Sequence, residues 1–199
     1  GVPATTTAPE LEVSQPRIYF GESAESQEYV VVNSLQEEVD YPLSTEGQSV
    51  AYTNYSGQGG VGIGSFFQRL GFSLRYSELN LMISNQLSDD SKIIMERNVT
   101  SRVKKAAPFL YTDNDPYLAL IEGDLFWIID MYTVSDKYPY AQPADTRRIN
   151  ERSGLPMNFN YIRNSVKAVV NAYDGTMKFY VFDEADPLIQ SYANIFPSL

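Results

Sequence analysis

Carboxylates are the side chains best suited to catalysis in this sequence, because histidine and cysteine are both absent. The chain therefore has no Ser-His-Asp or Cys-His nucleophile, no disulfide and none of the usual zinc ligands. Paired carboxylates do general acid and base work in glycosidases. Asp130, Asp136 and Asp183 stand near the ends of predicted strands, where such residues often sit. Solvated or arginine-paired acids are the alternative interpretation of the same three residues.

Clustered acids are the candidates for binding a cation, and three clusters occur: Asp89-Asp90, Asp113-Asn114-Asp115 and Asp183-Glu184 with Asp186. Their oxygens suit calcium or magnesium rather than zinc or iron. None matches an EF-hand loop, and the Asp-Pro pairs in two of them are typical of turns and helix caps. We therefore predict no metal site and no cofactor.

The glycine-rich run Ser56 to Ser65 (SGQGGVGIGS) contains the spacing G-x-G-x-x-G between a predicted strand and a predicted helix. That context is the one a dinucleotide site needs. However, no lysine follows for a phosphate-binding loop, and the preceding strand Val50 to Tyr55 is polar and rich in tyrosine. Strands buried in parallel sheets are apolar instead. A loop leading into a helix that Ser65 caps is the favoured interpretation.

The loop Ser135 to Pro143 (SDKYPYAQP) is the predicted binding segment, through Asp136, Lys137, Tyr138 and Tyr140. It leaves the best-defined strand, and its prolines reduce the entropy lost when the loop is fixed. Tyrosine offers a large contact area with a polar tip. The alternative is structural, with both rings folded back over the sheet.

Two hairpins are expected to position this loop. Tyr117 to Glu122 pairs with Leu125 to Thr133, and Ser165 to Tyr173 pairs with Met177 to Asp183 across an Asp-Gly turn. We predict that both lie in one antiparallel sheet, because isolated hairpins are only marginally stable in water. Further strands are predicted at 17–20, 29–33, 50–55 and 92–96, and helices at 66–74, 78–87, 98–107 and after Asp186.

This pattern predicts an α+β fold with about four helices, in which residues 1–16 form an extended lead-in and residues 17–199 one domain. The hydrophobic content of 43% suffices for a core, and the net charge of -10 argues against a nucleic-acid partner. No apolar run reaches the roughly 20 residues of a membrane span. Any such span would lie outside this sequence.

Several segments resemble uncharacterised protein family 0182, bacterial multi-pass membrane proteins with a large soluble region outside the membrane. They include PRIYFGE from Pro16, GGVGIGSFFQRL from Gly59, TVSDKYPYAQP from Thr133 and the long run from Asn160 to Pro197. Gly62 stands where the family pattern has proline. The resemblance implies an extracytoplasmic fragment of a cell-membrane protein and brings no known catalytic residues.

The sequence thus favours a non-enzymatic extracytoplasmic module that binds or assembles, with the membrane and an envelope protein as partners. Two alternatives remain open at this point. One is a carboxylate-based envelope hydrolase, with or without a divalent cation, and the other is an accessory domain of a transport system. An enzyme would need convergent acids in a pocket, whereas a binding module presents an aromatic or apolar surface.

Overall fold

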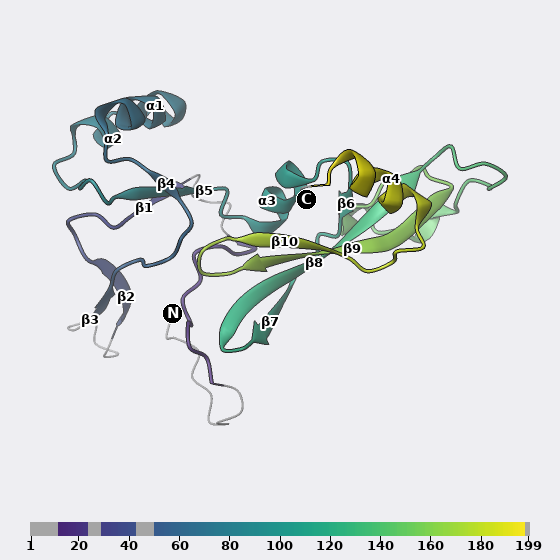
Figure 1. Ribbon diagram of the computed structural model, residues 1–199, viewed down its shortest axis with the longest axis horizontal. Coiled ribbons are helices and arrows are strands. Elements are labelled where there is room, and N and C mark those ends of the chain that lie inside the picture. The colour runs from purple at the N-terminus through teal and green to yellow at the C-terminus, as the bar shows by residue number, and fades with distance from the viewer. Residues whose placement is uncertain (1–11, 24–28, 43–49, 198–199) are drawn as a thin grey trace.

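The largest element of the computed structural model, which describes residues 12–23, 29–42 and 50–197, is a five-stranded antiparallel sheet (Figure 1). Its strands are β6 (Tyr111–Thr112), β7 (Tyr117–Ile121), β8 (Asp124–Ser135), β9 (Tyr161–Asn171) and β10 (Met177–Val181). They follow the order β10-β9-β8-β6, and β7 also pairs with β8. The described residues thus confirm an α+β fold with antiparallel sheets and four α-helices.

Both predicted hairpins lie in this sheet, which confirms that prediction. Glu122 and Gly123 join β7 to β8 with φ angles of 53° and 90°, the left-handed backbone that a two-residue hairpin turn requires. The long ladder between β8 and β9 joins the two hairpins, from Phe126 opposite Asn171 to Ser135 opposite Tyr161. Five residues, Ala172 to Thr176, connect β9 to β10, and Gly175 among them has a φ of 72°.

A smaller sheet occupies the other end of the molecule, at the left of Figure 1. It has the order β1-β5-β4, from β1 (Tyr29–Val32), β5 (Lys92–Met95) and β4 (Val61–Gly62). The helices α1 (Phe66–Tyr76) and α2 (Asn80–Ile83) lie beside it, and β2 (Glu38–Pro42) pairs separately with β3 (Val50–Thr53). Ser65 forms a capping box with Gln68, so the predicted start of α1 is confirmed.

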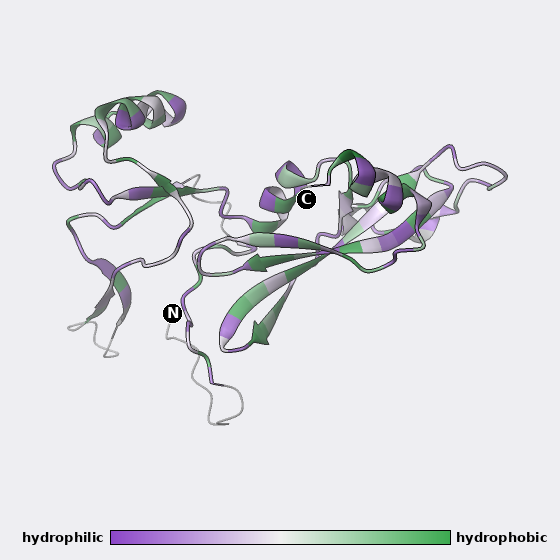
Figure 2. Ribbon diagram, in the orientation of Figure 1, coloured by the Kyte–Doolittle hydropathy of each residue, from purple (hydrophilic) through white to green (hydrophobic). Residues whose placement is uncertain are grey.

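One buried cluster connects the two ends of the molecule. It includes Phe20, Val32 and Ile94 together with the sheet residues Ile129 and Val170. It also takes in the inner faces of α3 (Val99–Ala106) and α4 (Pro187–Ile195), so both helices cover the same face of the larger sheet. A second cluster, centred on Ile63, Leu81 and Ile93, lies under α1 and α2. Hydrophobic residues also run along β7, as Figure 2 shows.

One predicted strand is absent, and one predicted helix is shorter than expected. Residues 17–20 form no strand, because the backbone N–H groups of Tyr19 and Phe20 both donate to one acceptor, the carbonyl of Ala172, instead of forming a ladder. The helix predicted over 78–87 covers only Asn80–Ile83. It ends where the hydroxyl of Ser84 accepts a hydrogen bond from the N–H of Gln86, a local turn that competes with helix propagation.

The predicted lead-in over 1–16 lies mostly outside the described residues. Within the described part, the N–H groups of Ser14 and Gln15 donate to the carbonyl of Gly123, so the chain runs beside the β7–β8 turn. The division into a lead-in and one domain stays a prediction.

Candidate functional site

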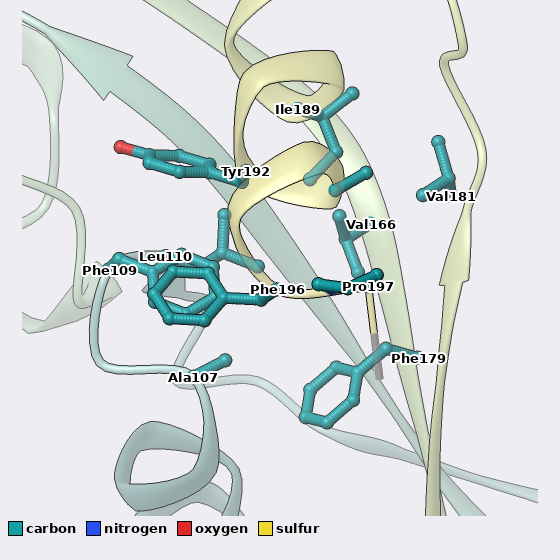
Figure 3. Close-up of a pocket in the computed structure, with 11 residues that line it drawn as sticks. Ala107, Phe109, Leu110, Val166, Phe179, Val181, Ile189, Tyr192, Phe196 and Pro197 are labelled. Carbon is teal, nitrogen blue, oxygen red and sulfur yellow. The ribbon is translucent and has the colours of Figure 1, made fainter. Parts of the chain in front are cut away.

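An apolar pocket lies between α4, the β9–β10 hairpin and the segment that follows α3 (Figure 3). Its cavity measures about 110 Å³. The helix and the residues after it contribute one wall, the hairpin a second, and the α3 exit a third. The lining residues are Ile189, Tyr192, Ala193, Phe196 and Pro197; Val166, Phe179 and Val181; and Ala107, Phe109 and Leu110.

Three aromatic rings fix the shape of one side of this pocket. Phe109 and Phe196 stack with their ring centroids 4.6 Å apart and their planes 9° from parallel. Phe109 also contacts Tyr192 at 4.9 Å. Stacked pairs add about 0.5–1.5 kcal/mol beyond the burial of their area. The stack therefore ties the C-terminal end of α4 to the segment after α3.

The N-terminal end of α4 is held by the buried carboxylate of Asp186. It caps the helix by accepting from the N–H of Leu188 at 3.0 Å, with Pro187 at the first helical position as predicted. The hydroxyl of Tyr161 donates to it at 2.6 Å, and the hydroxyls of Thr133 and Ser165 donate to its other oxygen. One side chain thus joins α4 to both central strands of the sheet.

The electrostatics of Asp186 follow from these contacts. Burial raises the pKa of its carboxyl, but the hydrogen bonds from Ser165, Thr133 and Tyr161 outweigh burial and hold the pKa below its usual value. Burial and the bond to Asp186 in turn raise the pKa of the Tyr161 phenol. The carboxylate is therefore charged, and each of its two oxygens accepts two hydrogen bonds. Its role is to hold α4 in place.

The pocket lining is largely apolar. Tyr192 is the one titratable residue in it, and the other lining residues have aliphatic or aromatic side chains. No acid, base or nucleophile pair lines the cavity, so this lining offers apolar contact and shape.

The predicted binding loop divides into an inner and an outer half. Tyr138 stacks on Tyr161 with centroids 4.4 Å apart, and its backbone exchanges hydrogen bonds with the side chain of Asn160. Tyr140 is fully exposed and has a left-handed φ of 59°. Asp136 and Lys137 are exposed as well. The structure therefore brings Tyr138 to the Tyr161–Asp186 contact and leaves the other three predicted residues in solvent.

Two of the three acids proposed for catalysis form ion pairs with basic residues. Asp130 pairs with Lys167 across β8 and β9, and Asp183 pairs with Arg163 at 3.0 Å. Asp136 is exposed on the loop that follows β8. Among residues 12–23, 29–42 and 50–197, no group of three acidic side chains is placed to hold a metal ion.

The glycine run packs closely against protein atoms. A Cβ on Gly57 would lie 2.4 Å from the Tyr55 hydroxyl, and one on Gly59 would lie 1.9 Å from the carbonyl oxygen of Asp174. These glycines are therefore required by the contact between the run, Tyr55 and the β9–β10 turn. Gly62, in β4, has open space at its Cβ position.

The sequence model of the uncharacterised protein family UPF0182 matches residues 1–199. The chain belongs to this family. A UPF0182 protein of Trichodesmium erythraeum is 46% identical over 95% of this chain and 21% of its own length. Those of Desulfitobacterium hafniense and Methanospirillum hungatei are 45% and 40% identical over 100% of this chain and 19% and 21% of their own lengths.

The chain thus spans about a fifth of the length of the curated UPF0182 relatives it matches. No solved structure matches it. None of the helices in its described parts has the length and apolar character needed to cross a bilayer. The family resemblance inferred from the sequence is confirmed.

The sequence of this UPF0182 chain predicted only some of the residues that line the pocket. Ile189, Tyr192 and Ile195 recur at helical spacing along α4; the first two line the cavity, whereas Ile195 is 64% exposed. Phe109 and Phe196 were missed, because one follows a helix-ending proline and the other follows the helix itself. The signal that could have identified them is an aromatic residue shortly after the end of an amphipathic helix.

Proposed function

We propose that this chain is a non-enzymatic packing module of a longer membrane protein, and that its α4 pocket receives an apolar side chain from another part of that protein. The observation that carries the proposal is the pocket itself, an apolar cavity without an acid–base pair in its lining. Binding by shape and apolar contact is the function that such a lining supports.

The occupant we propose is a residue in the segment that follows residue 199. Phe196 and Pro197, the last residues that the structure describes, belong to the helix wall of the pocket, so a segment joined after residue 199 would have a short path to it. The relatives are about five times as long as this chain. A cavity of roughly 150 Å³ takes up benzene, so a cavity of about 110 Å³ suits one aliphatic side chain.

The test compares the 199-residue chain with a chain extended by the segment that follows in the longer protein. Filling the pocket should raise the melting temperature of the extended chain. Ala193→Trp, which places an indole at the pocket, should abolish that increase. Asn194→Trp is the matched control, because Asn194 is also exposed on α4 but does not line the pocket. This variant should keep the increase in melting temperature. An extended chain that melts at the same temperature as the shorter one would contradict the proposal.

We also propose that the module lies on the extracytoplasmic side of the cell membrane, as the family resemblance implies. The chain has no cysteine, which permits site-specific labelling. Lys137→Cys, on the exposed loop, should react with a membrane-impermeant maleimide in intact cells that carry the longer protein. The unsubstituted protein and the buried variant Val170→Cys are the controls. Labelling of Lys137→Cys only after lysis would place the module inside the cell.

A further inference from the structure

The strand β10 leaves one edge of the larger sheet open. It stands at one end of the strand order and pairs with β9 alone. The pairing runs from Met177 opposite Val170 to Val181 opposite Val166 without a bulge. Proteins commonly protect such an edge with a bulge, a proline, a charge or a covering segment. Of these, β10 has one charge, the exposed Lys178, and no described segment pairs with its outer side.

The outward backbone groups of β10 belong to residues beside the α4 pocket. In an antiparallel pair, residues that bond to the neighbouring strand alternate with residues that bond away from it. The N–H of Phe182 donates to the carbonyl of Ser165, so the even-numbered residues of β10 bond to β9. Met177, Phe179 and Val181 therefore direct their N–H and C=O groups outward. Two of these three, Phe179 and Val181, also line the pocket.

A strand added at this edge would reach the pocket with its side chains. Side chains at paired positions of neighbouring strands lie on the same side of a sheet. The partner of Phe179 or Val181 would therefore extend toward the side on which α4 lies. Val181 is 45% exposed, so this part of the pocket rim is accessible. Figure 3 shows both side chains on the side of the pocket away from Phe109.

The helix α4 carries the chain back along β10. It starts beyond the C-terminal end of this strand, where its cap Asp186 accepts a hydrogen bond from Ser165 of β9. Pro197, which follows the helix, lines the pocket together with Phe179. A strand that follows would thus run in the same direction as β10. Parallel strands need a crossover of a dozen or more residues, usually with a helix, and residues 182–197, which contain α4, meet that requirement.

We propose that the segment that follows α4 in the longer protein adds to the open edge of β10 as a parallel strand. One of its side chains on the α4 side is then the apolar group that enters the pocket, so this inference rests on the proposed function. The tether to α4 holds the segment at a high effective concentration near the edge. A second copy of this chain has no such advantage, and the net charge of -10 on each copy opposes their contact.

Amide exchange along β10, resolved by nuclear magnetic resonance, tests the inference. In the 199-residue chain, the outward amides of Phe179 and Val181 should exchange at least about tenfold faster than the inward amides of Lys178 and Tyr180. Most of that difference should vanish in the chain extended past residue 199, because the added strand accepts hydrogen bonds from the outward amides. The inward amides are the matched control, because a general stabilisation of the fold slows both sets alike.

Outward amides that stay fast in the extended chain would overturn the inference. If the melting temperature of that chain nevertheless rises, the pocket is filled without an added strand, and the proposed function stands. Slowed outward amides that Ala193→Trp does not affect would support the strand and contradict occupancy of the pocket. Protection that appears in the 199-residue chain as its concentration rises would identify a second copy at the edge and overturn the inference.

Cysteine cross-linking tests the direction of the added strand. The 199 residues contain no cysteine, and the side chains of Lys178 and Tyr180 are exposed. Each is replaced by cysteine in the extended chain and paired with cysteines at successive positions after residue 199. The position that cross-links to Tyr180→Cys should lie two residues after the one that cross-links to Lys178→Cys. The reverse order, or cross-links at every position, would overturn the proposal of a parallel strand.

Discussion

The Tyr161 hydroxyl donates a hydrogen bond to the buried carboxylate of Asp186 at 2.6 Å, and Tyr138 stacks on the ring of the same tyrosine. Tyr161 and Asp186 thus connect Tyr138, in the surface loop after β8, to the N-terminus of α4. Because α4 forms a wall of the apolar pocket, the loop contributes to the geometry of that wall through its inner tyrosine.

Substitution of the two loop tyrosines should have unequal effects. Tyr138→Ala removes a stacked ring and should lower the free energy of unfolding by about 1–2 kcal/mol. Tyr140→Ala should change it by less than about 0.5 kcal/mol, because the side chain is fully exposed. Urea unfolding of both single variants checks this. Equal losses would show that the outer tyrosine also packs.

Removal of the Asp186 carboxylate should be among the most damaging single changes in the domain. Asp186→Ala leaves three hydroxyls and one helix N–H without their acceptor. The expected loss is about 3 kcal/mol or more. Ser165→Ala, which removes one donor and keeps the carboxylate, should cost about 1 kcal/mol. Thermal melting of the two variants provides the comparison.

The same carboxylate should make stability depend on acid pH. Its pKa in the folded protein is lowered, so its contribution is complete above the ordinary aspartate pKa. That contribution is lost as the pH falls through the lower folded value. The stability difference between the parent chain and Asp186→Asn should therefore shrink as the pH falls from 7 toward the acid limit of folding. A constant difference across that range would contradict this assignment.

The β9–β10 turn should not tolerate a side chain at Gly175. This residue has a φ of 72°, and a Cβ there would lie 2.4 Å from the ring of the buried Phe20. Both effects penalise Gly175→Ala, which we expect to cost about 2–4 kcal/mol. Gly71→Ala is the matched control, because nothing lies within 4 Å of its Cβ position. A stability gain is expected there, since alanine favours helix.

Alkaline titration should reveal the tyrosine cluster beneath the β9–β10 turn. Tyr55 packs against Tyr19 at 4.9 Å and Tyr173 at 5.1 Å. Burial, reinforced by Asp174 and Tyr173, raises the pKa of Tyr55 to about 12. The protonated form is thus favoured in the fold, and this contribution is lost as the pH rises past the ordinary tyrosine pKa. Ultraviolet titration of Tyr55→Phe should show one late-ionising phenol fewer.

Local signals predicted much of this fold. The Asp-Gly turn before β10, the Ser65 cap of α1 and the Asp186-Pro187 start of α4 each depend on neighbouring residues, and all three are confirmed. The hairpins followed from their turns. Family membership also followed from the sequence, because it depends on ordered motifs rather than on contacts.

Features that depend on distant residues were missed. Phe67 and Leu74 recur at helical spacing along α1, yet both are exposed. Phe72 and Tyr76 pack on the second cluster instead, and Arg69 donates to carbonyls before and after the helix. The α4 pocket needs Phe109 and Phe196 to meet across a large sequence separation. Of the four residues predicted as a loop binding site, Tyr138 stacks on Tyr161, a contact between residues far apart in the sequence. Periodicity gives no information on such partners.

Hydrogen exchange along α4 tests most directly whether the pocket receives a side chain from the longer protein. The amides of this helix should exchange at least about tenfold more slowly in the longer protein than in the 199-residue chain, because an occupied pocket opposes local opening. Ala193→Trp should remove the difference between the two proteins, and Asn194→Trp should keep it. Equal exchange rates for α4 in the two unsubstituted proteins would contradict the account.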